Sequence, residues 1–293
     1  MQNERDDLEK RINKLKKRTK VFDRVFEGGH RVSPLQKRVL TASILIPLVI
    51  ISIFFLPAKV FIFISLFIFL LAAWEWTRLA GFETNIKRSF ALLGMCVLFF
   101  ALSFGFIPLI YQVIGIWSFA SLAVLFYPRG TGIYGSKVLS LIIGALILFP
   151  AWAALTALQW DPKFLLYVMV LIWGVDTGAY FVGRCYGKHK LAALVSPGKT
   201  WEGVLGGLVV SLCIAASAFF FLNPKISLFP WLILSLITAV FSIIGDLFES
   251  LFKRLRNVKD SGTLLPGHGG ILDRIDSLIA AMPIFWLIYG VVS

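Results

Sequence analysis

The sequence predicts an all-α integral membrane protein, a polytopic bundle of about nine transmembrane helices. Of its 293 residues, 58% are hydrophobic and only 15% are charged, against roughly 25% charged residues in soluble globular domains. Apolar stretches long enough to cross a bilayer, about 17 to 25 residues, recur along the chain after a polar start. This composition excludes an ordinary soluble enzyme and a disordered chain, and three cysteines in or beside apolar runs exclude a disulfide scaffold.

Nine apolar stretches follow one another, separated by short polar segments or turn residues. Only Gly105, Phe106 and Pro108 mark the division between the third and the fourth stretch. The predicted spans are Val39–Leu56, Val60–Leu79, Phe90–Phe106, Ile107–Tyr127, Val138–Leu158, Phe164–Gly183, Gly203–Leu222, Phe229–Phe248 and Ile271–Val292.

Positive charge is distributed unevenly between the two sides that nine spans define. The polar segment before the first span and the alternate loops after it hold 12, 3, 2, 4 and 5 Lys and Arg residues. The intervening loops hold only Lys59, Lys163 and Lys225. Because cytoplasmic loops carry the excess of Lys and Arg, the pattern predicts a cytoplasmic N-terminus and, with an odd number of spans, Ser293 on the outside.

The first 38 residues are a basic tail. In it Leu8, Ile12, Leu15, Thr19 and Phe22 recur at spacings of four and three, which is typical of an amphipathic helix lying on anionic lipid. A solvated tail that only helps to set the topology fits the same composition. Because the first apolar run begins far beyond a normal signal-peptide start, we expect the first span to act as its own insertion signal.

Carboxylates cluster on the last two predicted helices. On a helix, Asp246, Glu249 and Lys253 share one face, and Asp273 and Asp276 are neighbours at the start of the last span. The connecting loop is short enough to make the two helices adjacent and antiparallel. Each carboxylate at membrane depth costs about 2.5 to 3.5 kcal/mol on insertion scales, so we expect cations to hold the cluster near the cytoplasmic surface.

The chemistry of this cluster favours a metal site. Oxygen ligands suit Mg²⁺, which keeps several waters and takes one or two carboxylates together with substrate phosphates. Zinc is not expected, because no Cys or His pair has ligand spacing. The alternative for each acid is a structural ion pair with Lys or Arg, but four acids on two adjacent helices favour the metal.

A second polar constellation precedes the seventh span. Asp176 lies in an apolar helix, and the segment from Ser196 to Gly203 follows as a loop. Ser196 is a suitable N-cap and Pro197 a suitable first helical residue, so we predict that backbone N–H groups and Lys199 face an anion there. In the alternative interpretation Lys199 only marks the cytoplasmic end of the span.

A glycine-rich run, from Gly267 to Gly270 with His268 inside it, precedes the last span. It is similar to an oxyanion-hole loop, but the sequence has no Gly-x-Ser-x-Gly elbow, so a hydrolase triad is not supported. We expect the glycines to let the backbone approach a phosphate closely. His268 is either a base or a hydrogen-bond donor.

The longest motif runs from Ser250 to Asp276. It reads Ser-Leu-Phe-Lys-Arg, then four residues, Lys-Asp-Ser-Gly, the five residues Thr-Leu-Leu-Pro-Gly, and His-Gly-Gly-Ile-Leu-Asp-Arg-Ile-Asp. This string resembles the signature of the phosphatidate cytidylyltransferases, also called CDP-diacylglycerol synthases, without a departure. The resemblance extends to Asp176–Tyr180 and to Ser196–Gly203, and so covers roughly the second half of the chain.

The resemblance implies that CTP and phosphatidic acid react at the cytoplasmic face to give CDP-diacylglycerol and pyrophosphate, with Mg²⁺, alone or with a second metal ion. It implies Asp246 and Asp273 as metal ligands, and we expect Glu249 and Asp276 as outer or alternate ligands. The lipid phosphate is already ionised near pH 7 and needs no general base, so His268 is expected to bind substrate. The catalytic candidates are Asp246, Lys259, Asp260 and Asp273, and the substrate-binding candidates are Ser196, Lys199, Lys253, Arg254, His268 and Arg274.

On this basis the chain divides into a basic cytoplasmic tail, 1–38, and a transmembrane catalytic domain, 39–293. Residues 39–160 form its variable half and 161–293 its motif-bearing half. The expected partners are CTP, phosphatidic acid and the bilayer of the inner (plasma) membrane, with a homodimer left open. The net charge of +13 then needs no nucleic acid. A CTP-dependent lipid kinase and a cation-coupled transporter are the two alternatives.

Overall fold

The computed structural model describes residues 34–105, 108–264 and 269–293, which are helical apart from one small hairpin and the connecting turns. The chain divides into two compact units, Met1–Ile46 and Pro47–Ser293, and the boundary falls at Pro47 inside helix α2 (Pro34–Phe55). Of the first unit, the helical residues 34–46 are described. The amphipathic helix predicted between Leu8 and Phe22 lies outside the described residues.

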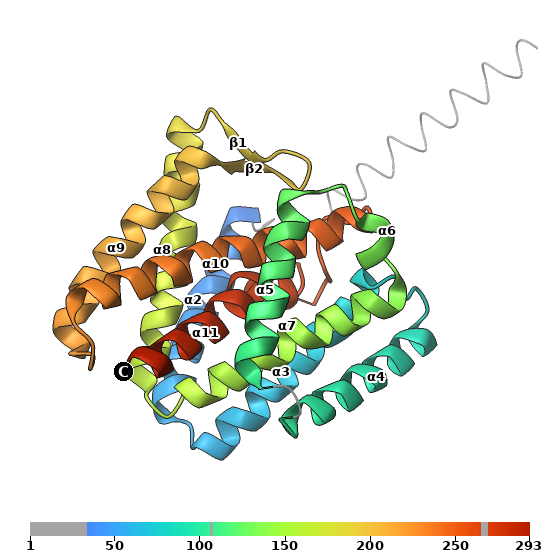
Figure 1. Ribbon diagram of the computed structural model, residues 1–293, viewed down its shortest axis with the longest axis horizontal. Helices are drawn as coiled ribbons and strands as arrows, with labels where there is room; N and C mark the ends of the chain where they lie inside the picture. Colours follow the sequence, from blue (N-terminus) through green and yellow to red (C-terminus); the bar gives the residue numbers. More distant parts are fainter. Residues whose placement is uncertain (1–33, 106–107, 265–268) are drawn as a thin grey trace, which may run out of the picture. The chain divides into compact units, whose positions relative to one another are not determined.

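The second unit contains the remaining elements (Figure 1). Each predicted span from the second to the ninth corresponds to one of its long helices, and the predicted break between the third and fourth spans separates α4 from α5. The elements are α3 (Ala58–Leu79), α4 (Asn85–Ser103), α5 (Leu109–Leu125), the single turn α6 (Thr131–Tyr134), α7 (Lys137–Leu158), α8 (Pro162–Tyr186), β1 (Lys190–Ala192), β2 (Ser196–Thr200), α9 (Trp201–Leu222), α10 (Leu228–Leu255) and α11 (Leu272–Val292).

Most of these helices are suited to a membrane. Among the described residues, seven helices are long and apolar enough to cross a bilayer: α3, α4, α7, α8, α9, α10 and α11. Two further apolar helices are shorter, Ser43–Phe55 and Leu109–Leu125. Large apolar side chains such as Phe90 and Phe100 on α4 and Val209 and Phe220 on α9 are exposed, as expected of surfaces that face hydrocarbon. The chain is therefore a multi-pass, all-α membrane protein, and the count of nine spans stays a prediction.

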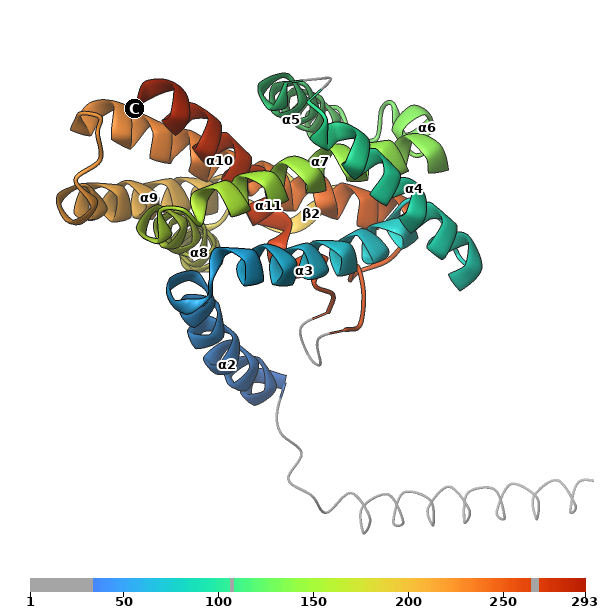
Figure 2. The same cartoon turned by 90° about the horizontal axis from the view of Figure 1, so that it is seen from below.

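Aromatic side chains fill the centre of the second unit. Trp76, Phe248 and Phe252 are fully buried, and the rings of Trp76 and Phe252 lie 4.8 Å apart. The Trp76 indole N–H donates to the Ser140 carbonyl oxygen of α7 over 2.8 Å, so the tryptophan joins α3 to α7 without leaving a buried donor unpaired. Figure 2 shows α3 and α7 running beside α11. The variable half thus supports the motif-bearing helices.

Small residues set the spacing of the motif-bearing helices. A side chain at Gly178 of α8 would come within 2.7 Å of Val210 Cγ2 and 3.0 Å of the Gly206 carbonyl oxygen on α9. A side chain at Gly245 of α10 would meet the Asp276 carbonyl oxygen of α11 at 2.5 Å. Helices α10 and α11 run in opposite directions, side by side (Figure 1), which confirms the predicted antiparallel pair.

The segment before α9 differs from the prediction. Ser196 and Pro197 were predicted to cap and begin the helix, but they lie in β2, which pairs antiparallel with β1. The N-cap is Thr200, whose hydroxyl oxygen accepts from the Gly203 N–H over 3.1 Å. That cap allows the helix to start at Trp201, so the residues before it are free to extend and pair.

Candidate active site

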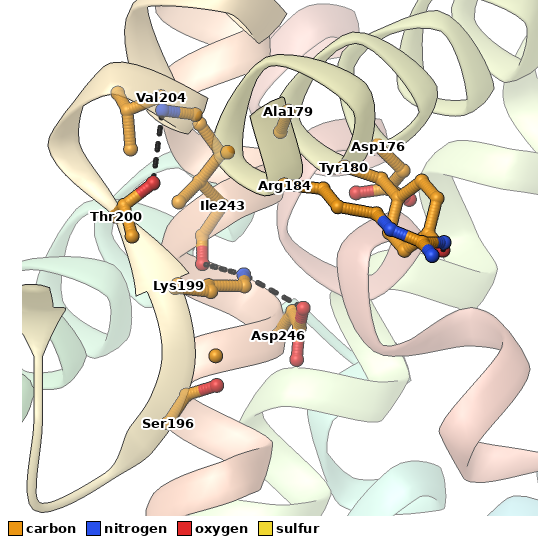
Figure 3. A pocket seen from close by; sticks show the side chains of 13 residues that line it. Asp176, Ala179, Tyr180, Arg184, Ser196, Lys199, Thr200, Val204, Ile243 and Asp246 are labelled. Atoms are coloured by element: carbon orange, nitrogen blue, oxygen red, sulfur yellow. Dashed lines mark hydrogen bonds and ion pairs between the residues drawn. The ribbon is translucent and has the colours of Figure 1, made fainter. Parts of the chain in front are cut away.

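A cleft of about 560 Å³ lies between α8, α9, α10 and the β1–β2 hairpin. Its charged lining comes from separate elements: Asp176 and Arg184 from α8, Lys199 from β2 and Asp246 from α10. Ser196 lines it as well, and its role in binding substrate stays a prediction. The hairpin brings Lys199 across to α10, and Figure 3 shows its side chain directed at Asp246. Residues 70 positions apart in the chain therefore share one cleft.

The Lys199–Asp246 ion pair is the centre of the cleft. Lys199 Nζ lies 2.6 Å from Asp246 Oδ2 and donates to the Ile243 carbonyl oxygen over 3.5 Å. Both side chains keep about a quarter of their surface exposed, 25% and 26%. Because the pair is open to the cleft, its ammonium group can bind an anionic substrate without first being uncovered. Lys199 therefore contacts α10 inside the cleft, and its role in binding substrate stays a prediction.

Arg184 is a second cation of the cleft; in the sequence it is one of the four Lys and Arg residues of the loop before the seventh predicted span. Its Nη1 donates to the Tyr180 hydroxyl over 2.7 Å, and its guanidinium lies 5.9 Å from the centre of the Tyr180 ring. The planar guanidinium is well suited to bidentate contact with phosphate. Arg184 and Lys199 therefore make the cleft attractive to a polyphosphate.

Lys253 joins α10 to α11 through two carboxylates. Its Nζ lies 2.7 Å from Glu249 Oε2 and 2.9 Å from Asp273 Oδ1. The side-chain exposures are 12% for Lys253, 0% for Glu249 and 6% for Asp273. Among residues 34–105, 108–264 and 269–293, the second oxygen of Glu249 has no hydrogen-bond partner. The predicted convergence of acids from two facing helices is therefore present, with a lysine between them.

Asp273 is held by the backbone as well. The Ser261 N–H donates to both of its carboxylate oxygens, over 3.2 and 3.0 Å, and the Gly270 N–H donates to Oδ2 over 2.8 Å. Asp276 accepts from the Ser277 N–H over 2.7 Å. The four predicted metal ligands thus fall into two settings, with Asp246 facing the cleft and Asp273 on the α10–α11 bridge.

The carboxylates of the cleft fit a magnesium ion that takes most of its ligands from substrate and water. Within the part of the chain that the structure describes, no three His, Cys, Asp or Glu side chains are grouped to hold a metal ion by themselves. Asp176 and Asp246 nevertheless line the same cleft. Two carboxylates suffice for Mg²⁺ when substrate phosphates and water supply its other ligands. The assignment of Mg²⁺ to Asp246, Glu249, Asp273 and Asp276 stays a prediction.

The other predicted site residues lie along the segment between α10 and α11. Arg254 Nε donates to the Val195 carbonyl oxygen over 2.9 Å, so this arginine supports the hairpin beside the cleft. Lys259 and Asp260 are exposed in the loop, and Arg274 is exposed on the first turn of α11. His268 lies outside the described residues.

The glycines before α11 make room for carboxylates of the protein itself. Gly269 has φ +82°, and a side chain there would meet Asp273 Oδ2 at 2.7 Å. At Gly270 a side chain would collide with the carboxylate of Glu75 and the hydroxyl of Ser261. These contacts account for glycine at both positions, and the close approach of a phosphate stays a prediction.

Comparison with known proteins identifies the family of the chain. Residues 36–292 match the model of the cytidylyltransferase family. The chain belongs to that family. It is 44% identical over 260 residues to the phosphatidate cytidylyltransferase of Pseudomonas aeruginosa, a match covering 86% of this chain and 95% of the relative. It is 37% identical over 283 residues to that of Haemophilus influenzae, covering 87% and 98%.

The match of this cytidylyltransferase to its relatives is not confined to the motif-bearing half. A third relative, the phosphatidate cytidylyltransferase of Staphylococcus haemolyticus, is 47% identical over 121 residues, 41% of this chain and 46% of the relative. The two longer matches, by contrast, extend over most of the chain. The similarity therefore includes part of the half that the motifs alone left as variable.

Three residues in or near the candidate site of this cytidylyltransferase were not predicted from the sequence: Thr200 and Arg184 line the cleft, and Glu75 bonds to the turn before α11. Thr200 was hidden by the stronger capping signal at Ser196, and Arg184 by its place among the topology charges. Glu75 is only 2% exposed and lies three residues before Arg78, inside the second predicted span. An acid within a predicted span was the available signal, because such residues rarely lack a function.

Proposed function

We infer that this cytidylyltransferase joins CTP to phosphatidic acid, giving CDP-diacylglycerol and pyrophosphate. The observation that carries the inference is the 44% and 37% identity to proteins named phosphatidate cytidylyltransferase, over 95% and 98% of their lengths. The cleft supports it independently, because two cations that could bind a polyphosphate, Lys199 and Arg184, are among its lining residues.

In the proposed reaction, a phosphate oxygen of phosphatidic acid attacks the α-phosphorus of CTP. The bond from that oxygen to the α-phosphorus forms, the bond from the α-phosphorus to the bridging oxygen breaks, and pyrophosphate leaves. The nucleophile is already an anion, so the barrier is set by repulsion between two anions and by their positioning. Lys199 and Arg184 would neutralise the phosphates, and the diacyl tails stay in the bilayer.

We propose that Mg²⁺, alone or with a second metal ion, takes part. Asp246 and Asp273 are the ligands that the resemblance implies, with Glu249 and Asp276 as outer or alternate ligands, and Asp176 shares the cleft with Asp246. When bound, the ion supplies further positive charge to the triphosphate. The ion pairs seen for Asp246 and Asp273 support the view that these carboxylates remain ionised and able to bind a cation.

We further propose nine spans, a cytoplasmic N-terminus and an active site on the cytoplasmic face of the inner membrane. The charge bias of the loops supports this orientation, and the hairpin with Lys188, Lys190 and Lys199 belongs to the basic side. A homodimer is compatible with this arrangement and is not required by it.

The direct test uses membranes that carry the chain, incubated with labelled CTP and phosphatidic acid, with and without EDTA. We expect lipid-linked CMP and pyrophosphate in the complete reaction, and neither product with EDTA. Full activity in EDTA would contradict only the proposal that magnesium takes part, and would leave the proposed reaction standing. The absence of lipid-linked CMP from the complete reaction would refute the proposed function.

The same assay separates the two alternatives. A CTP-dependent lipid kinase transfers the γ-phosphate and releases CDP, so detection of CDP in place of pyrophosphate would identify it. A cation-coupled transporter predicts ion flux across sealed vesicles without any dependence on CTP. The Ser250 to Asp276 motif and the family match favour the transferase.

A further inference from the structure

The carboxylate of Glu75 connects the variable half of the chain to the signature segment. Glu75 lies near the end of α3, 2% exposed. Its Oε1 accepts from the Ile271 N–H over 3.1 Å, and its Oε2 accepts from the Leu272 N–H over 2.8 Å. The Ser261 hydroxyl also donates to Oε2, over 3.0 Å. Glu75 thus makes three hydrogen bonds to residues nearly 200 positions away.

These bonds give α11 a cap from another helix. The helix begins at Leu272 and has no side-chain cap of its own at Ile271. The first N–H groups of a helix have no partner within it, and a carboxylate there also interacts favourably with the helix dipole. Glu75 accepts from these N–H groups and brings a negative charge to the start of the helix. A residue of α3 therefore fixes where α11 starts.

The segment from Ser261 to Gly270 is bonded at its ends to two carboxylates, those of Glu75 and Asp273. Ser261 donates its hydroxyl to Glu75 and its backbone N–H to Asp273. Gly270 donates its N–H to Asp273, and a side chain at Gly270 would collide with Glu75. A side chain at Gly262 would collide with Glu75 too. The glycines of the signature therefore leave room for these carboxylates, and its serine donates hydrogen bonds to both of them.

The same end of α3 holds the start of the connecting segment. Arg256 follows α10, and its guanidinium donates to the carbonyl oxygens of Leu79 and Ala80 over 2.8 and 2.9 Å. Figure 2 shows the segment leaving α10 and passing beside α3. Arg256 and Glu75 thus attach the beginning and the end of this segment to one helix.

We propose that Glu75 is a positioning residue for the cytidylyltransferase reaction, because it fixes the turn and the first residues of α11 that present Asp273. This inference rests on the proposed function for its effect on turnover. It goes beyond the signature, since Glu75 lies in the half of the chain without motifs. Glu75 is not among the residues that line the cleft; its side-chain oxygens accept from Ser261 and from the start of α11.

The test compares Glu75→Gln with Glu83→Gln, a matched control that removes the same charge from an exposed residue just beyond α3. A glutamine can accept with one oxygen only, so at least one of the three donors loses its acceptor. We expect kcat to fall by about 10-fold or more in Glu75→Gln. The KM values for CTP and phosphatidic acid should stay within about threefold, as is typical when only transition-state interactions are lost. Glu83→Gln should match the wild-type chain.

A second measurement does not depend on activity. Amide hydrogen exchange of the peptide covering residues 269–275 should be faster in Glu75→Gln than in the wild-type chain and unchanged in Glu83→Gln. If the wild-type chain makes no CDP-diacylglycerol, the proposed function fails, while the exchange experiment still tests the role of Glu75. Wild-type kcat in Glu75→Gln would overturn the proposal. A loss of kcat that only follows the loss of folded protein, with unchanged exchange, would overturn it too.

Ser261→Ala provides the test if Glu75→Gln does not accumulate as folded protein. It removes one hydrogen bond to Glu75 and leaves the carboxylate and both α11 N–H bonds in place. We expect the same direction of change in kcat and exchange, with a smaller size. No change in either quantity would contradict the proposal.

Discussion

Lys253 stands between two carboxylates that have almost no contact with solvent. A buried ion is stable only when its charge is compensated at close range. With Glu249 at 0% and Asp273 at 6% exposure, the ammonium group is what allows both acids to remain between α10 and α11. The burial of Glu249 and Asp273 between these helices therefore depends on Lys253.

Replacing Lys253 by Met tests this dependence. Removing one partner of a buried ion pair typically costs about 3 to 5 kcal/mol, because the remaining charge is left uncompensated. We expect Lys253→Met to lower the unfolding temperature of the purified protein in detergent strongly. Lys137→Met, at an exposed lysine, should leave that temperature unchanged. Equal unfolding temperatures for the two variants would show that Glu249 and Asp273 do not need the lysine.

The role of Lys199 is tested against another lysine of the same hairpin. Lys199 pairs with Asp246 in the cleft, whereas Lys190 is exposed on β1. Loss of one preorganised group that stabilises developing charge costs on the order of 100-fold in kcat. We expect that loss for Lys199→Met in the assay for lipid-linked CMP, and wild-type turnover for Lys190→Met. Similar turnover of both variants would remove Lys199 from the site.

Single-residue predictions from the sequence succeeded where the partners share a helix. The face with Asp246, Glu249 and Lys253 follows from helical spacing alone, and the Glu249–Lys253 pair has that geometry. The partners of Asp246 and Glu75 could not be predicted in the same way. They depend on how a hairpin folds across α10 and on how α3 packs beside α11, which no local spacing encodes.

At the scale of elements, glycines decide how closely α8 and α9 approach each other. We use Gly178→Ala and Gly115→Ala as matched variants. A methyl group at Gly178 would lie 2.7 Å from Val210 Cγ2 and 3.0 Å from a backbone carbonyl, whereas at Gly115 of α5 it would meet nothing within 4 Å. Overpacking typically costs about 1 to 3 kcal/mol, while alanine in place of glycine favours a helix by up to about 1 kcal/mol.

The two substitutions should therefore change the stability of the protein in different directions. We expect Gly178→Ala to lower the unfolding temperature and Gly115→Ala to leave it unchanged or raise it. Because α8 and α9 both line the cleft, turnover should fall with Gly178→Ala alone. If Gly178→Ala were as stable and active as the wild-type chain, the close approach of α8 and α9 would not matter to the site.

The helices could be predicted, because a long apolar run in a membrane protein has few alternatives to a helix. The hairpin could not be predicted, since three- and five-residue strands are too short to show a periodic pattern. Ser196 and Pro197 also carried a capping signal that Thr200 overrode. Short polar segments between spans are where local patterns are weakest, and here such a segment carries Lys199.

At the scale of the whole molecule, the basic loops, the hairpin and the acids of α10 and α11 are predicted to share one side of the membrane. Single cysteines in a background without Cys96, Cys185 and Cys213 test this directly. We expect Lys225→Cys, in the exposed loop before α10, to react with a membrane-impermeant maleimide in intact cells. Lys188→Cys, beside the hairpin, should react only after the membrane is opened. The reverse pattern would place the cleft outside the cell. That result would contradict both the proposed use of CTP at the cytoplasmic face and the orientation that the charge bias of the loops predicts.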